Sequence, residues 1–142
     1  MRTAFTAAQL EDPGLAEAAA AVRGCVHCGL CNATCPTYQV LGDERDGPRG
    51  RIQLMQRMLE ANATPSATVV RHVDRCLSCL SCRTTCPSSV DYLRLVDEAR
   101  AHIAQTYRRP ASERWFRTFL AAVLPRPALF RLAMKAAPLA RP

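Results

Sequence analysis

The sequence predicts an all-α fold for this chain of 142 residues, and three observations support the prediction. Apolar residues recur at helical spacing in most segments, and residues that favour helix starts precede those segments. No segment alternates apolar and polar side chains as a half-buried strand would. Because only 6% of the residues are aromatic, large ring side chains cannot dominate the core, and we expect another feature to help organise the fold.

Two helices are expected in the first half of the chain. The first follows Asp12, a favoured capping residue, covers residues 13–23 and ends before Gly24. The second follows a turn-forming cluster at residues 42–50 and covers residues 51–60, where apolar side chains recur at i, i+3 and i+7. Both patterns describe helices with one apolar face, so both are expected to pack on a common core.

Two further helices are expected in the second half. Thr64 and Pro65 start a short helix that leads into a cysteine-rich segment, and Ser88 or Ser89 caps a longer one. The apolar stripe of the longer helix consists of Tyr92, Leu95, Val96, Ala99 and Ile103. Such stripes can also bind a partner, but packing within the domain is the simpler interpretation.

A basic tail begins near Pro110. Residues 107–142 contain eight basic side chains and one acidic one, which equals the whole net charge of +7, so the rest of the chain is nearly neutral. The tail is expected to form two short amphipathic helices separated by Pro125 and Pro127. The apolar face of the first consists of Trp115, Phe116, Phe119, Leu120, Val123 and Leu124. Such helices lie on an anionic membrane surface, dock on a partner or begin a further domain, and we favour the last interpretation.

All eight cysteines lie in two copies of one motif, C-x2-C-x2-C-x3-C-P, at Cys25–Pro36 and Cys76–Pro87, which begin 51 residues apart. Two-residue gaps allow three thiolates to reach three corners of one [4Fe–4S] cube. In two-cluster ferredoxins with this motif, the fourth cysteine ligates the other cube. The repeat therefore predicts two [4Fe–4S] clusters.

The ligands are expected to cross between the two copies. The first cluster takes Cys25, Cys28, Cys31 and Cys86. The second cluster takes Cys76, Cys79, Cys82 and Cys35. This arrangement ties the two halves of the chain together and keeps the clusters close enough for an electron to pass between them.

Other uses of the cysteines fit the sequence less well. A zinc site needs two C-x2-C pairs and has no use for a third cysteine at the same interval. A disulfide framework needs an oxidising compartment, and the sequence begins without an export signal and contains no apolar stretch long enough to span a membrane. A three-iron cluster lacks one ligand of the motif, whereas both copies are complete here. We therefore expect a cytoplasmic protein with two iron–sulfur clusters.

Residues between the ligands have several interpretations. The side chains expected to shield the clusters from water are Val26, Leu30, Leu77 and Leu80. Because four cysteines complete each cube, His27 is expected at the surface or in a hydrogen bond rather than as a ligand. Arg83 either favours the reduced state of a nearby cluster or is a solvated loop residue, and both interpretations stay open.

Three stretches carry a resemblance to a known family. Residues 25–52, residues 74–90 and residues 123–130 resemble the iron–sulfur subunit of bacterial glycolate oxidase (glycolate dehydrogenase). The discriminating piece is G-D-E-R-D-G-P-R-G-R-I at residues 42–52, since many families share the cysteine motif. Within it, Arg49 is a candidate for tuning a cluster or docking a partner, or it is only a helix-start arginine.

The resemblance implies an α-helical ferredoxin with two [4Fe–4S] clusters bound in loops between helices. It also implies a complex in which FAD-linked subunits oxidise glycolate to glyoxylate and electrons leave through the clusters toward a quinone. The chain would be an electron-transfer subunit with no catalytic residue of its own. The alternative is the same role beside another flavin-linked dehydrogenase, of the anaerobic glycerol-3-phosphate or lactate type, or in a heterodisulfide-reductase-like complex.

The expected domains are an N-terminal helix at 1–24, a two-cluster ferredoxin-type domain at 25–106 and a basic helical tail at 107–142. The family resembled here has a C-terminal half rich in cysteines, but no cysteine follows Cys86, so the tail is interpreted as the start of a missing region. That missing region would contact the quinone. The protein is expected in the cytoplasm, with peripheral contact at the cytoplasmic face of the inner membrane. We expect no nucleic-acid partner, because the body is neutral and the tail aromatics share a face with aliphatic side chains.

Overall fold

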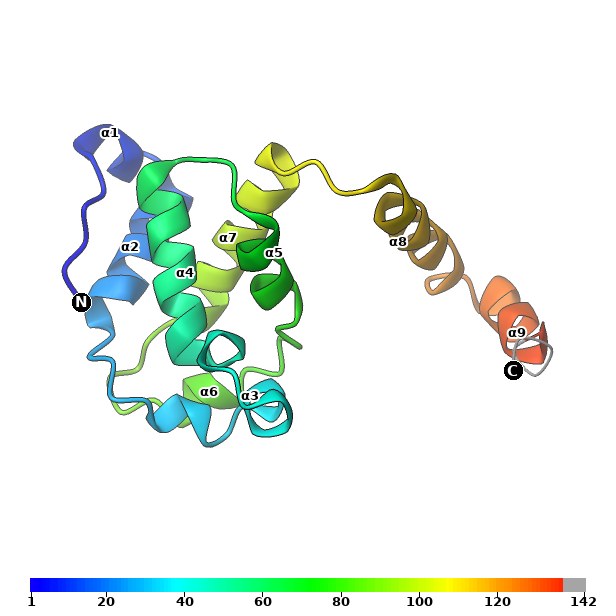
Figure 1. Cartoon of the computed structure of the whole chain (residues 1–142), viewed down its shortest axis with the longest axis horizontal. Coiled ribbons are helices and arrows are strands. Elements are labelled where there is room, and N and C mark those ends of the chain that lie inside the picture. Colours follow the sequence, from blue (N-terminus) through cyan, green and yellow to red (C-terminus); the bar gives the residue numbers. More distant parts are fainter. Residues whose placement is uncertain (137–142) are drawn as a thin grey trace. The chain divides into compact units, whose positions relative to one another are not determined.

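The structure is a computed structural model that describes residues 1–136 (Figure 1), so the last residues of the predicted tail, 137–142, lie outside the described residues. Its α-helices are α1 (Ala7–Leu10), α2 (Pro13–Gly24), α3 (Pro36–Leu41), α4 (Pro48–Ala61), α5 (Ala67–Asp74), α6 (Ser81–Thr84), α7 (Tyr92–Thr106), α8 (Ala111–Val123) and α9 (Pro127–Ala136). Two 3₁₀ turns, η1 (Leu30–Asn32) and η2 (Glu44–Asp46), complete the regular structure. No strand occurs in this part of the chain, and the predicted all-α fold is confirmed.

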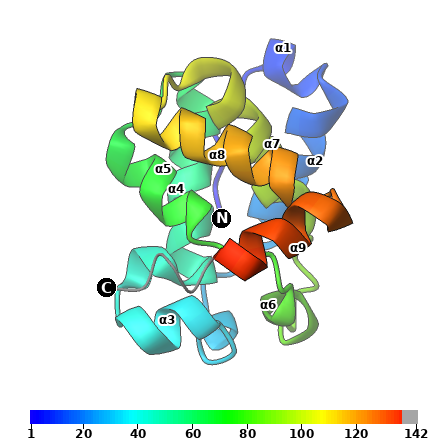
Figure 2. The ribbon, with the colours of Figure 1, turned by 90° about the vertical axis from the view of Figure 1, so that its right-hand side faces the viewer.

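The described chain divides into two compact units, Met1–Tyr107 and a second that begins at Arg108. In the first unit, the short helices α3 and α6 lie together at the end opposite α1 in both views (Figures 1 and 2). The longer helices α2, α4, α5 and α7 enclose the core above them. The two cysteine motifs therefore lie at one end of a helical frame.

The core forms mainly between α2 and α7. Ala18, Ala19 and Val22 of α2 are fully buried, and the small alanine side chains allow the two helices to approach closely. The predicted apolar stripe of α7 is confirmed, because every member is buried. Met55 and Leu59 of α4 close the core from a second side. Burial of these apolar side chains supplies the main driving force for the frame.

The predicted start of α2 is confirmed. The Asp12 carboxylate accepts a hydrogen bond from the N–H of Leu15 at 3.0 Å, and Pro13 occupies the first helical position, where its missing N–H costs nothing. The helix includes Gly24 as its last residue and leads directly into Cys25. The cap therefore fixes where the chain enters the first cysteine motif.

Two other predicted helix starts, at residues 64–65 and 88–89, were wrong. α5 begins after Ser66, whose hydroxyl caps it, and α7 begins after Asp91. At Ser89 the backbone is left-handed, with φ of 50°, and its N–H donates to the Cys86 carbonyl at 3.1 Å. The serines therefore form the turn by which the chain leaves the second cysteine motif.

The second unit contains both predicted tail helices. On α8, the rings of Trp115 and Phe119 stack with centroids 5.7 Å apart, and Glu113 pairs with Arg117 at 2.9 Å. The rings are substantially exposed, Trp115 at 70%. Among the described residues, no helix is both long enough and apolar enough to cross a membrane.

Candidate metal centres

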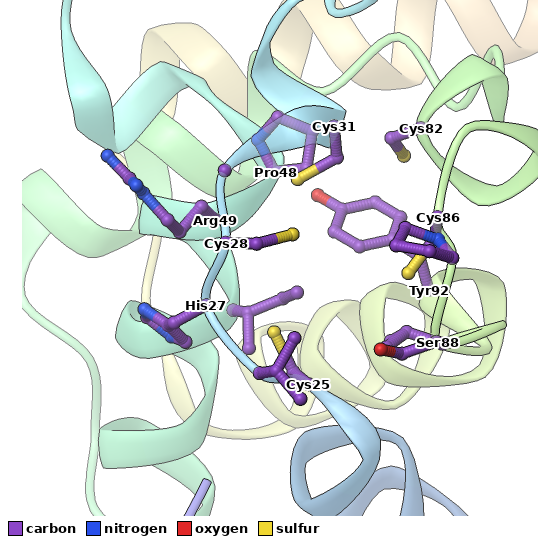
Figure 3. A pocket seen from close by; sticks show the side chains of 15 residues that line it. Cys25, His27, Cys28, Cys31, Pro48, Arg49, Cys82, Cys86, Ser88 and Tyr92 are labelled. Carbon is purple, nitrogen blue, oxygen red and sulfur yellow. The ribbon is translucent and has the colours of Figure 1, made fainter.

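Two neighbouring pockets collect the cysteines of both motifs. The first pocket is lined by Cys25, Cys28, Cys31, Cys82 and Cys86, and Figure 3 shows these thiols around a common space. The second pocket is lined by Cys35, Cys76, Cys79 and Cys82. Each pocket thus contains the first three cysteines of one motif and the fourth of the other. Cys82, Pro48 and Tyr92 line both pockets and so lie between them.

The two motifs fold into the same local backbone. His27 and Gly29 have left-handed φ values of 58° and 83°, and the equivalent residues of the second motif, Ser78 and Leu80, have values of 54° and 59°. A left-handed conformation is unfavourable for residues other than glycine, and such strain gathers at ligand sites. Backbone turns of this kind aim successive N–H groups at one point and form anion-binding concavities, including iron–sulfur sites. Both loops therefore fit a compact, negatively charged group.

Two of the partly buried thiols in these pockets, Cys31 and Cys82, resist ionisation. Burial, together with the nearby Cys76, raises the pKa of Cys82 to about 12, and burial together with Cys25 raises the pKa of Cys31. Cys79 is the exception, because hydrogen bonding from the Ser81 backbone lowers its pKa. Metal ligation requires thiolates and releases protons, so a metal centre accounts for the gathering of at least four thiols in each pocket.

Tyr92 lies at the site, although the sequence did not indicate this position. It was expected only as part of an apolar stripe, but its hydroxyl donates to Cys76 Sγ at 3.8 Å, within the range for a bond to sulfur. The side chain is 3% exposed, and burial raises its pKa well above the ordinary value, so the phenol keeps its proton. Tyr92 therefore lies between the two pockets and donates a hydrogen bond to a thiol of the second pocket.

A buried ionic cluster lies behind the second pocket, and the sequence analysis also missed it. Asp46, Arg51 and His72 are all at least 97% buried. The Asp46 carboxylate lies 2.9 Å from His72 Nδ1, 3.0 Å from Arg75 Nη1 and 3.6 Å from Arg51 Nη2. Since arginines already pair with this carboxylate, the cluster is a salt-bridge network rather than a cation site.

Arg51 connects this network to the second pocket. Its Nε donates to the His72 carbonyl at 2.7 Å, its Nη2 to Thr37 Oγ1 at 3.1 Å, and its Nη1 to Cys35 Sγ at 3.8 Å. The guanidinium is therefore held by several partners in fixed directions. One of these partners, Cys35 Sγ, is a ligand predicted from the sequence.

Arg49 lies beside the first pocket and is more than a helix-start residue. Its Nε donates to Glu44 at 2.6 Å, and Asn32 donates to the same carboxylate at 3.0 Å. A Cβ atom at Gly29 would lie 2.6 Å from Arg49 Nη1, so the arginine packs directly on the first cysteine loop. The Arg49 hydrogen bond lowers the pKa of Glu44, which keeps this ion pair charged.

The other residues between the ligands are less constrained. Arg83 is half-exposed and lies 3.6 Å from Asp91, so its two interpretations stay open. In Figure 3 the ring of His27 lies on the other side of the loop from the Cys28 thiol. Among the predicted shielding residues, Val26 lines the first pocket and Leu77 and Leu80 line the second. Three of them are nevertheless largely exposed: Val26 at 69%, Leu77 at 67% and Leu30 at 55%.

Comparisons with known proteins agree with this geometry. Residues 21–90 match the family described as "4Fe-4S dicluster domain". The whole chain is 48% identical to the glycolate oxidase iron-sulfur subunit of Escherichia coli (strain K12), of which it covers 35%. Over 94 residues, or 66% of the chain, it is 40% identical to the probable glycolate oxidase iron-sulfur subunit of Bacillus subtilis (strain 168), of which it covers 21%. The chain thus spans about a third of the first relative and about a fifth of the second. No solved structure matches it.

Proposed function

From the match of residues 21–90 to the 4Fe-4S dicluster domain family, we propose that the chain is an electron-transfer subunit of a glycolate-oxidising dehydrogenase complex. The observation that carries the proposal is the pair of cysteine pockets, one for each of the two [4Fe–4S] clusters. The similarity to two glycolate oxidase iron-sulfur subunits supplies the substrate. The alternative, supported by the shared cysteine motif, is the same role beside another flavin-linked dehydrogenase or in a heterodisulfide-reductase-like complex.

We propose the crossed ligand sets for the two clusters. One set is Cys25, Cys28, Cys31 and Cys86, and the other is Cys76, Cys79, Cys82 and Cys35. The lining of the first pocket supports the role of Cys86, and that of the second supports the role of Cys35. Cys82 lines both pockets, and the order of the motif assigns it to the second cluster.

The residues of the chain hold and insulate the clusters. When bound, [4Fe–4S] clusters accept and release single electrons. The cysteines fix their positions, the left-handed loops direct backbone N–H groups toward them, and Tyr92 donates a hydrogen bond to Cys76. Hydrogen bonds to sulfur and exclusion of water set the reduction potential. No residue is assigned to substrate conversion, which belongs to a flavin subunit in this proposal.

The proposed partners follow from this division of labour. An FAD-linked subunit oxidises the substrate and delivers electrons one at a time, and a quinone accepts them beyond this chain. The proposed location is the cytoplasm, with peripheral contact at the inner face of the membrane through the basic second unit. Its exposed aromatic and basic side chains support such contact.

We expect about eight iron atoms and about eight acid-labile sulfides per chain in protein purified without oxygen, because two cubes contain four of each. Colorimetric iron and sulfide assays, with zinc measured by mass spectrometry on the same sample, check this expectation. A protein that is folded and holds stoichiometric zinc in place of iron would contradict the assignment.

We expect the chain to copurify with a flavoprotein and glycolate to bleach the visible absorption of its clusters in the anaerobic complex. The reason is that electrons from glycolate can reach the clusters only through a flavin subunit. Glycerol 3-phosphate and lactate are the control substrates. Bleaching by one of these, and not by glycolate, would move the chain to the alternative function.

A further inference from the structure

We propose that Arg51 raises the reduction potential of the cluster held by Cys35, so that this cluster is the electron-accepting member of the pair. The inference rests on the proposed function, which places a cluster on that cysteine. Beyond the proposed function, one buried arginine would set the direction of electron flow, from the first pocket to the second.

The Arg51 charge lies in the interior, next to a sulfur atom of the second pocket. The Arg51 side chain is 1% exposed, and its Nη1 donates to Cys35 Sγ at 3.8 Å. Bonds to the His72 carbonyl and to Thr37 Oγ1 hold the guanidinium in this orientation. A charge away from water is weakly screened, so it acts on the neighbouring thiolate more strongly than a surface arginine would.

Asp46 does not fully neutralise the Arg51 charge. Its carboxylate is 3.0 Å from Arg75 Nη1 but 3.6 Å from Arg51 Nη2, so Arg75 is the closer of the two cations. Arg51 and Arg75 share the single negative charge of Asp46, so the carboxylate only partly offsets the Arg51 charge beside Cys35. A buried cation whose counter-charge is shared remains unfavourable, and a thiolate on Cys35 supplies further negative charge.

The arginine beside the first pocket is in a different environment. Arg49 is the arginine that lines it, and this side chain is 36% exposed and pairs with Glu44 at 2.6 Å. Its charge is neutralised by the carboxylate and screened by solvent. One-electron reduction makes a cluster more negative by one charge, so a buried cation favours the reduced state. The second pocket is therefore the more easily reduced site.

The test is an anaerobic redox titration followed by electron paramagnetic resonance on the loaded protein. For Arg51→Gln we expect the equilibrium constant for reduction of the Cys35 cluster to fall about tenfold, or about 59 mV for a one-electron couple. The other cluster should keep its potential. Arg51→Lys retains the charge, so the potential of the Cys35 cluster should fall by less than half as much as in Arg51→Gln. A purely structural role of Arg51 would lower that potential equally in both variants.

The matched control is Arg45→Gln, because Arg45 lies nearby in the chain, in η2, but pairs with Asp43 at the surface. We expect it to leave both potentials unchanged. If Arg51→Gln loses the cluster, Arg75→Gln provides the measurement, since Arg75 is 44% exposed and its removal leaves Asp46 less neutralised. A smaller fall in the same potential supports the proposal, and an unchanged potential in a variant with full iron content overturns it.

The assignment of clusters to cysteines is tested separately. Cys28→Ser and Cys79→Ser identify the signals of the first and second clusters, because each residue is a middle cysteine of one motif. If Arg51→Gln shifts the potential of the cluster identified by Cys79→Ser, the result supports both the crossed ligand sets and the role of Arg51. If Arg51→Gln instead shifts the potential of the cluster identified by Cys28→Ser, the proposed direction of electron flow is overturned and the crossed ligand sets are wrong. If neither signal shifts, the role of Arg51 fails while the ligand assignment stands.

Discussion

Cys86→Ser is expected to remove or alter the cluster held by the first cysteine motif, although the substitution lies in the second. Cys86 lines the first pocket with Cys25, Cys28 and Cys31. A serine hydroxyl is a poor substitute for a thiolate ligand of iron. We expect iron to fall from about eight to about four atoms per chain, with the resonance of the second cluster retained. Metal analysis and electron paramagnetic resonance on the same anaerobic sample check this result.

Cys35→Ser is the reciprocal control, and it should alter the second cluster while the first is retained. Cys28→Ser and Cys79→Ser again identify which resonance belongs to which cluster. The crossed ligand sets would be disproved by a Cys86→Ser protein that keeps the cluster altered by Cys28→Ser and loses the one altered by Cys79→Ser.

Gly50→Ala is expected to destabilise the first unit by about 3 kcal/mol, since it forces extra volume into a closely packed contact. A Cβ atom at Gly50 would collide with the Glu44 carbonyl oxygen and would lie 2.7 Å from its carbon and 3.0 Å from the Arg45 Cα. These are backbone atoms of η2, which cannot rotate away as a side chain can. Urea unfolding of the loaded protein without oxygen, followed by helical circular dichroism, measures the change.

Gly24→Ala is the matched control, because it adds the same methyl group at another helical glycine. No atom lies within 4 Å of a Cβ built at Gly24. We expect its free energy of unfolding to change by no more than about 0.5 kcal/mol. Equal unfolding midpoints for the two variants would show that α4 and η2 can separate without cost.

The sequence predicted the helical frame well because its signals are local. The Asp12 cap and the spacing of Leu95, Val96 and Ala99 reflect helix geometry, which a single segment determines. The short helices α1, α3 and α6 were not predicted, because four to six residues carry too little periodicity. The cysteine pockets followed from motif spacing alone, since two-residue gaps leave few ways to arrange three thiolates.

The sequence analysis missed what depends on contacts between distant segments. Asp46, Arg51 and His72 come from η2, α4 and α5, and no local pattern shows that their charges meet in the interior. One signal was present. Arg51 stands at i−4 from Met55 and i−7 from Met58, on the buried face of α4, where an exposed arginine is not expected.

The sharing of each pocket between the two motifs has a consequence for biogenesis. While the ribosome synthesises the chain, the first three cysteines emerge long before Cys86, and Cys35 long before Cys76. Neither pocket has its full lining until Tyr92 has left the exit tunnel and the helical frame has closed. Iron and sulfide can therefore fill either pocket completely only after the two motifs have folded against each other.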